Sequence, residues 1–165
     1  MRVYLPATTA IARRLLDQHR LDPPLTAFAV TPGLREWYVD DDIDELEYAA
    51  MLEAARASLR LIDADPSAAR RRVVVALDTP DADVEVRDDL DRGVVRLGAP
   101  VPLASVASVH LDEADAQAAV AAAADAIVAA DLGSAQAQDT VDDAEGFELS
   151  WYATQELARV LDAIA

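Results

Sequence analysis

An unbroken apolar run, Val73-Val74-Val75-Ala76-Leu77, places the strongest constraint on how this chain can fold. Its β-branched residues favour a strand over a helix. A strand with one solvated face alternates apolar and polar side chains, so a continuous run predicts a strand that is covered on both faces. The basic cluster Arg70-Arg71-Arg72 precedes this run, and we expect it at a strand edge or in an internal ion pair.

Other segments with strand-forming residues lie on both sides of this run, at 2–5, 25–30, 84–86, 94–97 and 106–111. Segments with helical spacing are interleaved with them, at 8–19, 32–38, 43–62, 112–131 and 148–164. Strands follow one another directly in the middle of the chain, so the order is not the strict alternation of a Rossmann or barrel fold. We therefore predict a single α+β domain over residues 1–165, with a mixed central sheet of about five or six strands and helices packed on it.

The longest predicted helix covers residues 43–62. Its small and branched apolar residues recur at a spacing of three and four, as in Leu46, Ala50 and Ala54. Asp42, followed by Glu45, matches an acidic form of the capping box that marks a helix start. This segment therefore predicts a long helix with one face against the sheet.

The balance of charge limits the partners of this chain, because 31 acidic residues stand against 14 basic ones for a net charge of −17. A surface this negative repels nucleic-acid phosphates and anionic membranes, so we expect neither as a partner. Another protein or a second copy of the chain is compatible with it. There is no Cys, which excludes disulfides and thiolate chemistry. Residues 1–9 lack the features of a secretory signal, and we expect a cytoplasmic protein.

No pattern typical of an active site occurs, so we assign no catalytic residue, no metal ligand and no cofactor. His19 and His110 are far apart in the sequence, and neither a nucleophile elbow nor a glycine-rich phosphate loop is present. His110 is the better placed histidine, since Asp112 and Glu113 follow it closely. The acidic loop 40–44 leaves a metal-dependent hydrolase as the weakest alternative, because helix capping explains its carboxylates. Whether the protein is an enzyme stays open, and the inventory argues against it.

Two aromatic pairs are the most notable candidates for a binding surface. Trp37-Tyr38 ends the short predicted helix 32–38, and Trp151-Tyr152 begins the last predicted helix. Adjacent helical positions diverge by about 100°, so one ring of each pair can be buried while the other is exposed. Large exposed rings are favoured anchors for a partner or a ligand. The first hypothesis is therefore a non-catalytic, acidic interaction or regulatory domain that uses Trp37, Tyr38, Trp151 and Tyr152.

The strings VYLPAT at 3–8, LTAFAVTP at 25–32 and ELEYAAMLEAARASLRLI at 45–62 resemble a small uncharacterised actinobacterial family. APVPLASVASVHLDE at 99–113 and SWYATQEL at 150–157 extend the resemblance over the whole chain. The resemblance implies a domain of unknown function and brings no activity with it.

The order of the elements also resembles the small ADP-ribosyltransferase-like proteins. In those proteins, residues of the first two strands hold NAD, and a later Glu orients the ribose. The resemblance implies that Tyr4 and Thr31 line a nucleotide pocket, with His110 as a further lining residue. Ala99 and Pro100 stand where the Glu is expected. The alternative hypothesis is therefore a nucleotide-binding domain without transferase activity, and it requires the strands of Tyr4 and Thr31 to be neighbours.

Overall fold

A computed structural model describes residues 1–39 and 41–164. Its main element is a seven-stranded sheet in the order β5-β6-β3-β1-β4-β8-β9, and every neighbouring pair in it is antiparallel. Strands β2 and β7 form a separate two-stranded sheet. The strands are β1 Arg2–Ala7, β2 Arg20–Leu21, β3 Leu25–Phe28, β4 Val73–Asp78, β5 Val84–Val86, β6 Val94–Leu97, β7 Val101–Pro102, β8 Val106–Leu111 and β9 Ser150–Tyr152.

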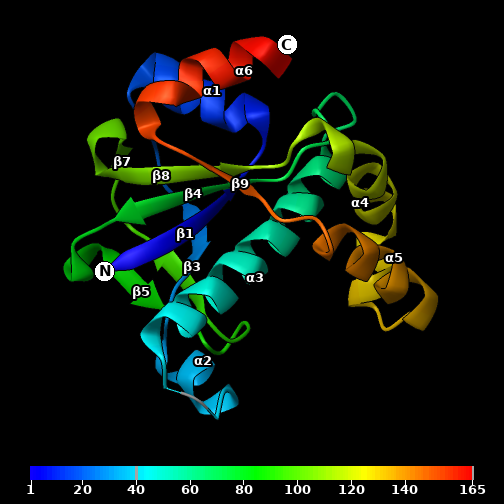
Figure 1. Ribbon diagram of the computed structural model, residues 1–165. Helices are drawn as coiled ribbons and strands as arrows, with labels where there is room; N and C mark the ends of the chain where they lie inside the picture. The colour runs from blue at the N-terminus through cyan, green and yellow to red at the C-terminus, as the bar shows by residue number, and fades with distance from the viewer. Residues whose placement is uncertain (40, 165) are drawn as a thin grey trace.

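Helices cover both faces of the main sheet (Figure 1). They are α1 Thr9–Gln18, α2 Pro32–Trp37, α3 Ile43–Ala64, α4 Gln117–Asp131, α5 Ala135–Glu145 and α6 Leu157–Ile164. Short 3-10 turns lie at Asp81–Asp83, Leu103–Ser105, Ala114–Ala116 and Thr154–Glu156. None of the helices that the structure describes is both long and apolar enough to cross a bilayer.

The alternation of side chains along β1 divides the core into two layers. Val3 and Leu5 point to one face and pack with residues of α1 and α6. Tyr4 points to the other face, where α3 lies across the sheet and contributes Ala50 and Ala54. The C-terminal half of α3 then packs on α4 and α5 in a third, alanine-rich cluster. Figure 1 shows α1 and α6 together at one side of the sheet and α3 running diagonally across it.

The α+β prediction is confirmed, and the main sheet has seven strands rather than five or six and is antiparallel rather than mixed. The predicted double-sided strand is β4, whose Val73–Leu77 segment is buried throughout between β1 and β8. The predicted long helix is α3, and the side chain of Asp42 accepts a hydrogen bond from the Asp44 backbone at its start. The additional strand of the main sheet is the short β9. The spacing of apolar residues in the sequence does not distinguish such a short strand from the start of a helix.

The prediction that Trp151-Tyr152 begins a helix is wrong. These residues lie in strand β9, where Trp151 pairs with His110 and Tyr152 pairs with Val109. Tyr152 packs against the core beneath α1 and α6, while Trp151 points to the opposite face. Pairing with β8 outweighs the helical spacing of residues 148–156, and the helix α6 begins only at Leu157.

The expectation of an internal ion pair in the basic cluster is confirmed at Arg72. Its guanidinium donates to both carboxylate oxygens of Asp112, at 2.9 and 2.8 Å, and also to the Phe147 carbonyl at 2.9 Å. The Arg72 backbone N–H donates to the same carboxylate at 2.7 Å. The two side chains are 2% and 0% exposed, so this ion pair joins β4 to the end of β8 inside the core.

Candidate functional site: a slot between β1 and β3

The candidate site is a slot that opens where β1 and β3 separate. Among the described residues β1 pairs with β3 only at Tyr4 and Phe28, whereas its ladder to β4 runs from Arg2 to Ala7. Proline has no backbone N–H to donate. Because the β4 ladder continues through Pro6, the missing donor falls on the β3 side of β1. The next ladder bond between β1 and β3 is therefore absent, and the strands separate beyond Tyr4.

The resulting slot has a volume of about 900 Å³, which is in the range of pockets that hold small organic molecules. Both layers of helices contribute to its walls, α1 through Ile11 and α3 through Ala57. Phe28 and Val94, each 6% exposed, lie at its floor on β3 and β6. The Thr26 side chain also lines it and is solvent-exposed. An apolar floor with polar groups around it is the usual construction of a ligand pocket.

Seven charged side chains line the slot, and three of them are already in ion pairs. Asp22 pairs with Arg20 at 3.2 Å, and Arg60 pairs with Asp131 at 2.7 Å. The remaining four form no ion pair within the described part of the chain: Arg14, Glu53, Asp91 and Arg96. Two guanidiniums and two carboxylates thus line the slot outside any ion pair of the described residues, and Arg14, Asp91 and Arg96 are exposed to solvent.

The Glu53 carboxyl is half-buried in the wall of the slot, and its surroundings shift its pKa. Burial raises the pKa of its carboxyl, and the neighbouring Asp91 carboxylate raises it further. The guanidiniums of Arg56, Arg60 and Arg92 act in the opposite direction without cancelling these effects. Two carboxylates that repel each other beside an apolar floor are stabilised by a proton or by the cationic group of a ligand.

Asp88 fixes the loop that carries Asp91. Its carboxylate accepts hydrogen bonds from the Thr31 hydroxyl at 2.6 Å, the Gly33 backbone at 2.9 Å and the Gly93 backbone at 3.0 Å. A Cβ on Gly33 would lie 2.6 Å from the Asp88 Cγ, so only glycine allows this approach. The wall of the slot formed by residues 90–91 is therefore tied to the start of α2.

The first aromatic pair lies near this loop. Trp37 is 62% exposed, and the Arg92 guanidinium lies 3.6 Å from the centre of its ring. Tyr38 follows the end of α2 and is 43% exposed. Both residues are thus placed at the surface, as the hypothesis of a binding surface requires, but Trp37 is already stacked on a cation of its own chain.

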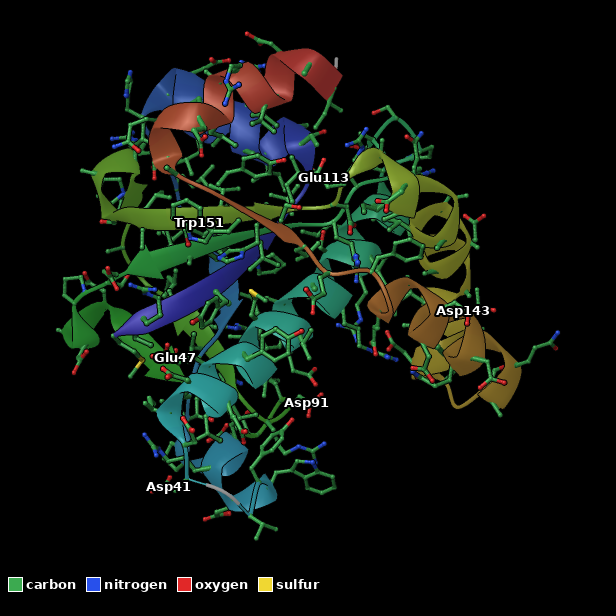
Figure 2. All side chains as sticks on the ribbon, in the orientation of Figure 1. Asp41, Glu47, Asp91, Glu113, Asp143 and Trp151 are labelled. Carbon is green, nitrogen blue, oxygen red and sulfur yellow. The ribbon has the colours of Figure 1, made fainter. Side chains whose placement is uncertain are left out.

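The second aromatic pair lies elsewhere, on both faces of the edge strand β9. Trp151 is 60% exposed and lies over the β4–β8 half of the sheet, away from Asp91 (Figure 2). Tyr152 is half-buried on the opposite face and its hydroxyl donates to Glu113. The four predicted aromatic residues therefore do not form one surface.

Three predicted residues share the α3-facing side of the sheet outside the slot. Tyr4 is buried, its hydroxyl is 3.5 Å from a carboxylate oxygen of Glu47, and burial followed by that carboxylate raises its pKa to about 12. His110 lies beside Trp151 in the ladder and its Nε2 is 3.1 Å from the Ser108 hydroxyl. Burial and then the Arg2 guanidinium lower the pKa of His110, which favours the neutral imidazole. None of these three side chains lines the slot.

Thr31 is buried and fully engaged. Its hydroxyl donates to Asp88 and accepts from the Leu34 backbone as the N-cap of α2. The strands β1 and β3, which carry Tyr4 and lead to Thr31, are neighbours, as the nucleotide-binding hypothesis requires. The Thr31 side chain nevertheless has no free hydrogen for a ligand.

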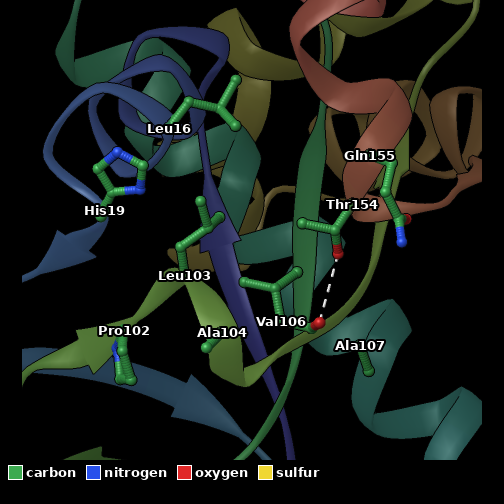
Figure 3. A pocket seen from close by; sticks show the side chains of 9 residues that line it. All are labelled: Leu16, His19, Pro102, Leu103, Ala104, Val106, Ala107, Thr154 and Gln155. Atoms are coloured by element: carbon green, nitrogen blue, oxygen red, sulfur yellow. Dashed lines mark hydrogen bonds between the residues drawn. The ribbon is translucent and has the colours of Figure 1, made fainter.

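A second hollow of about 700 Å³ lies between the end of α1, β7 and the start of β8 (Figure 3). Its lining includes His19, which caps α1 in a left-handed conformation with φ 60°. The Thr154 hydroxyl in its wall donates to the Val106 carbonyl at 3.3 Å. No Asp, Glu or Arg lines this hollow, so it offers less specific recognition than the slot.

None of the four charged residues of the slot that lack an ion pair was predicted from the sequence as a site residue. The available signals were indirect: Pro6 as the end of a strand, and the acidic segment that contains Asp91. In the described ranges no three His, Asp or Glu side chains are placed to hold a metal ion. Asp40, part of the acidic loop considered as a metal site, lies outside the described residues.

Comparison with known proteins gives a family without a function. The model of DUF6912, described as a family of unknown function, matches residues 1–161. No curated protein and no solved structure matches the chain.

Proposed function

Because this chain belongs to the DUF6912 family, whose function is unknown, we propose a function from its own geometry: it is a binding domain for a small organic molecule. The molecule enters the slot between β1 and β3. One observation carries the proposal. A cavity of about 900 Å³ combines an apolar floor with four charged side chains that have no ion pair among the described residues.

The half-buried Glu53 carboxylate lies near the Asp91 carboxylate beside an apolar floor, and both burial and this repulsion are unfavourable for its charged form in the empty protein. A ligand that supplies complementary charges recovers this free energy on binding. One wall and the floor are also held before binding, since Asp88 ties the 90–91 loop to α2 and the slot floor belongs to the main sheet. A preformed site loses little entropy when a ligand enters, which favours binding.

We expect Thr26→Trp to fill the slot and to weaken binding by about tenfold or more, a change of at least about 1.4 kcal/mol. Thr26 is exposed in β3, where an aromatic residue suits a strand, so the variant is expected to fold. Binding is measured by ligand-observed NMR with a mixed fragment library that includes NAD, ADP-ribose and ATP. Val86→Trp, on the exposed edge strand β5 outside the slot, is the matched control. Equal binding by Thr26→Trp and the wild type would overturn the proposal.

The nucleotides in that library, NAD, ADP-ribose and ATP, also test the resemblance to ADP-ribosyltransferase-like proteins, which stays a prediction. The actinobacterial source stays a prediction as well. The neighbouring positions of β1 and β3 support it, and the engaged Thr31 hydroxyl weighs against it. Binding of NAD or ADP-ribose that Thr26→Trp removes would favour this class of ligand for the slot.

The interaction hypothesis also stays a prediction, and Trp151 is its strongest candidate because its ring is 60% exposed on an edge strand. We expect Trp151→Ala to change the free energy of unfolding by less than about 0.5 kcal/mol, as for other exposed positions. If Trp151 anchors a second copy, the variant lowers the apparent mass in sedimentation at high protein concentration. If the wild type and Trp151→Ala have the same apparent mass, self-association through this ring is excluded.

A further inference from the structure

We infer that the ligand of the slot is a zwitterion with an apolar body about 7 Å long, the chemistry of an apolar dipeptide with free termini. The inference rests on the proposed function, because it names the class of ligand for the same slot. It follows from the signs of the charged groups, their positions along the walls, and the apolar floor between them.

The charged groups without ion pairs come in opposite signs from different elements. Arg14 belongs to α1 and Arg96 to β6, and both present guanidiniums to the slot. Glu53 belongs to α3, and Asp91 to the loop before β6. Glu85 lies across the ladder from Arg96 but forms no ion pair with it within the described residues. A ligand with a single charge would pair with one sign of these groups, whereas a ligand with both charges forms charge-assisted hydrogen bonds with both signs.

The length of the β6 segment from the floor to Arg96 indicates the length of the ligand's apolar body. Asp91 lies before the first residue of this strand, Val94, and Arg96 lies two residues beyond it. An antiparallel strand rises about 3.4 Å per residue, so Val94 and Arg96 are about 7 Å apart. An extended dipeptide also covers about 7 Å, since each residue adds about 3.3–3.6 Å. A carboxylate at Arg96 therefore leaves the ammonium group on the side of Glu53 and Asp91.

The floor between these charges suits the middle of an apolar dipeptide. Phe28 and Val94 are cross-strand partners on the slot side of β3 and β6, and Pro6 faces them from β1. The strand edges of β1 and β3 are not paired with each other beyond Tyr4 and Phe28. Open strand edges bind extended peptides through their backbone groups, with pockets for the side chains.

The test uses L-leucyl-L-leucine and two matched probes, the N-acetylated dipeptide and the dipeptide C-terminal amide. Each matched probe lacks one of the two charges and keeps the apolar body. We expect the free dipeptide to bind the full-length protein in isothermal titration calorimetry. We expect the affinity of each capped probe to be lower by about tenfold or more. Equal binding of the three probes would overturn the zwitterion inference.

Charge-removing variants assign the two ends of the ligand. Arg96→Gln is expected to remove the preference for the free dipeptide over its amide, and Glu53→Gln the preference over the acetylated form. Arg159→Gln, on an arginine that is 79% exposed outside the slot, is the control and should keep both preferences. If Arg96→Gln and Glu53→Gln both keep the wild-type preferences, the assignment of ends is wrong.

The outcomes separate this inference from the proposed function. If library fragments bind in the slot and Thr26→Trp removes them, while the dipeptide does not bind, the slot is a binding site and the zwitterion inference is wrong. If neither the fragments nor the dipeptide bind, both proposals are overturned.

Discussion

Asp112→Ala is expected to lower the free energy of unfolding by about 3–5 kcal/mol, because it leaves a buried arginine without its counter-charge. The Arg72 side chain is 2% exposed, and its guanidinium donates two hydrogen bonds to the Asp112 carboxylate. The same carboxylate also accepts the backbone N–H of Arg72. Urea denaturation followed by circular dichroism measures the loss.

The cost in Asp112→Ala comes from the uncompensated charge more than from the lost pair itself. A double variant, Arg72→Met with Asp112→Leu, removes both charges and keeps apolar volume, so we expect it to be more stable than Asp112→Ala. Arg159→Ala breaks an exposed pair with Glu156 and should cost less than about 1 kcal/mol. A loss below about 1 kcal/mol for Asp112→Ala would show that the pair is not buried as described.

Asp88→Asn is expected to lower the free energy of unfolding by about 1–3 kcal/mol, because three donors converge on this carboxylate. An amide presents an NH₂ group to a site that needs acceptors, so one backbone donor loses its partner. Gly33→Ala should have a similar effect by pushing on the same side chain, whereas Gly98→Ala meets nothing within 4 Å and is the matched control. Equal stability of the two glycine variants would contradict the close approach of Gly33 and Asp88.

The Asp88 contribution depends on pH in a direction that the structure determines. Burial alone would raise the pKa of this carboxyl, but the hydrogen bonds from Thr31, Gly33 and Gly93 outweigh burial and hold the pKa below its usual value. A lowered folded-state pKa stabilises the protein above the unfolded-state value of about 3.9, and this contribution is lost as the pH falls through the folded-state pKa. We expect Asp88→Asn to differ most from the wild type near neutral pH and least near pH 2–3. A constant difference between pH 7 and pH 3 would contradict the prediction.

The sequence correctly predicted those elements in which the spacing of apolar residues matches the faces that are buried in the structure. The run Val73–Leu77 is apolar at every position, so it indicated a strand covered on both faces before any partner was known. The segment that forms α3 carries helical spacing and an acidic start, and it is a helix. The basic cluster Arg70-Arg71-Arg72 was expected at a strand edge or in an internal ion pair, and Arg72 forms such a pair with Asp112.

The same kind of pattern gave the wrong secondary structure for a segment whose conformation depends on pairing with a strand that is distant in the sequence. Residues 150–152 were predicted to begin a helix, and their pairing with β8 makes them a strand. The sequence indicated that the rings of Trp37 and Trp151 could be exposed, and they are. It did not show that the two rings lie on separate parts of the surface.

The sequence by itself determined the α+β class, the buried strand, the long helix and the acidic character of the chain, because each follows from residues within one or two turns or strands. Only the tertiary structure determined the slot. Arg14, Glu53 and Arg96 come from α1, α3 and β6, and no local spacing relates them. They meet because Pro6 interrupts one ladder in the middle of the sheet, and the consequence of a missing hydrogen bond depends on which strand lies beside it.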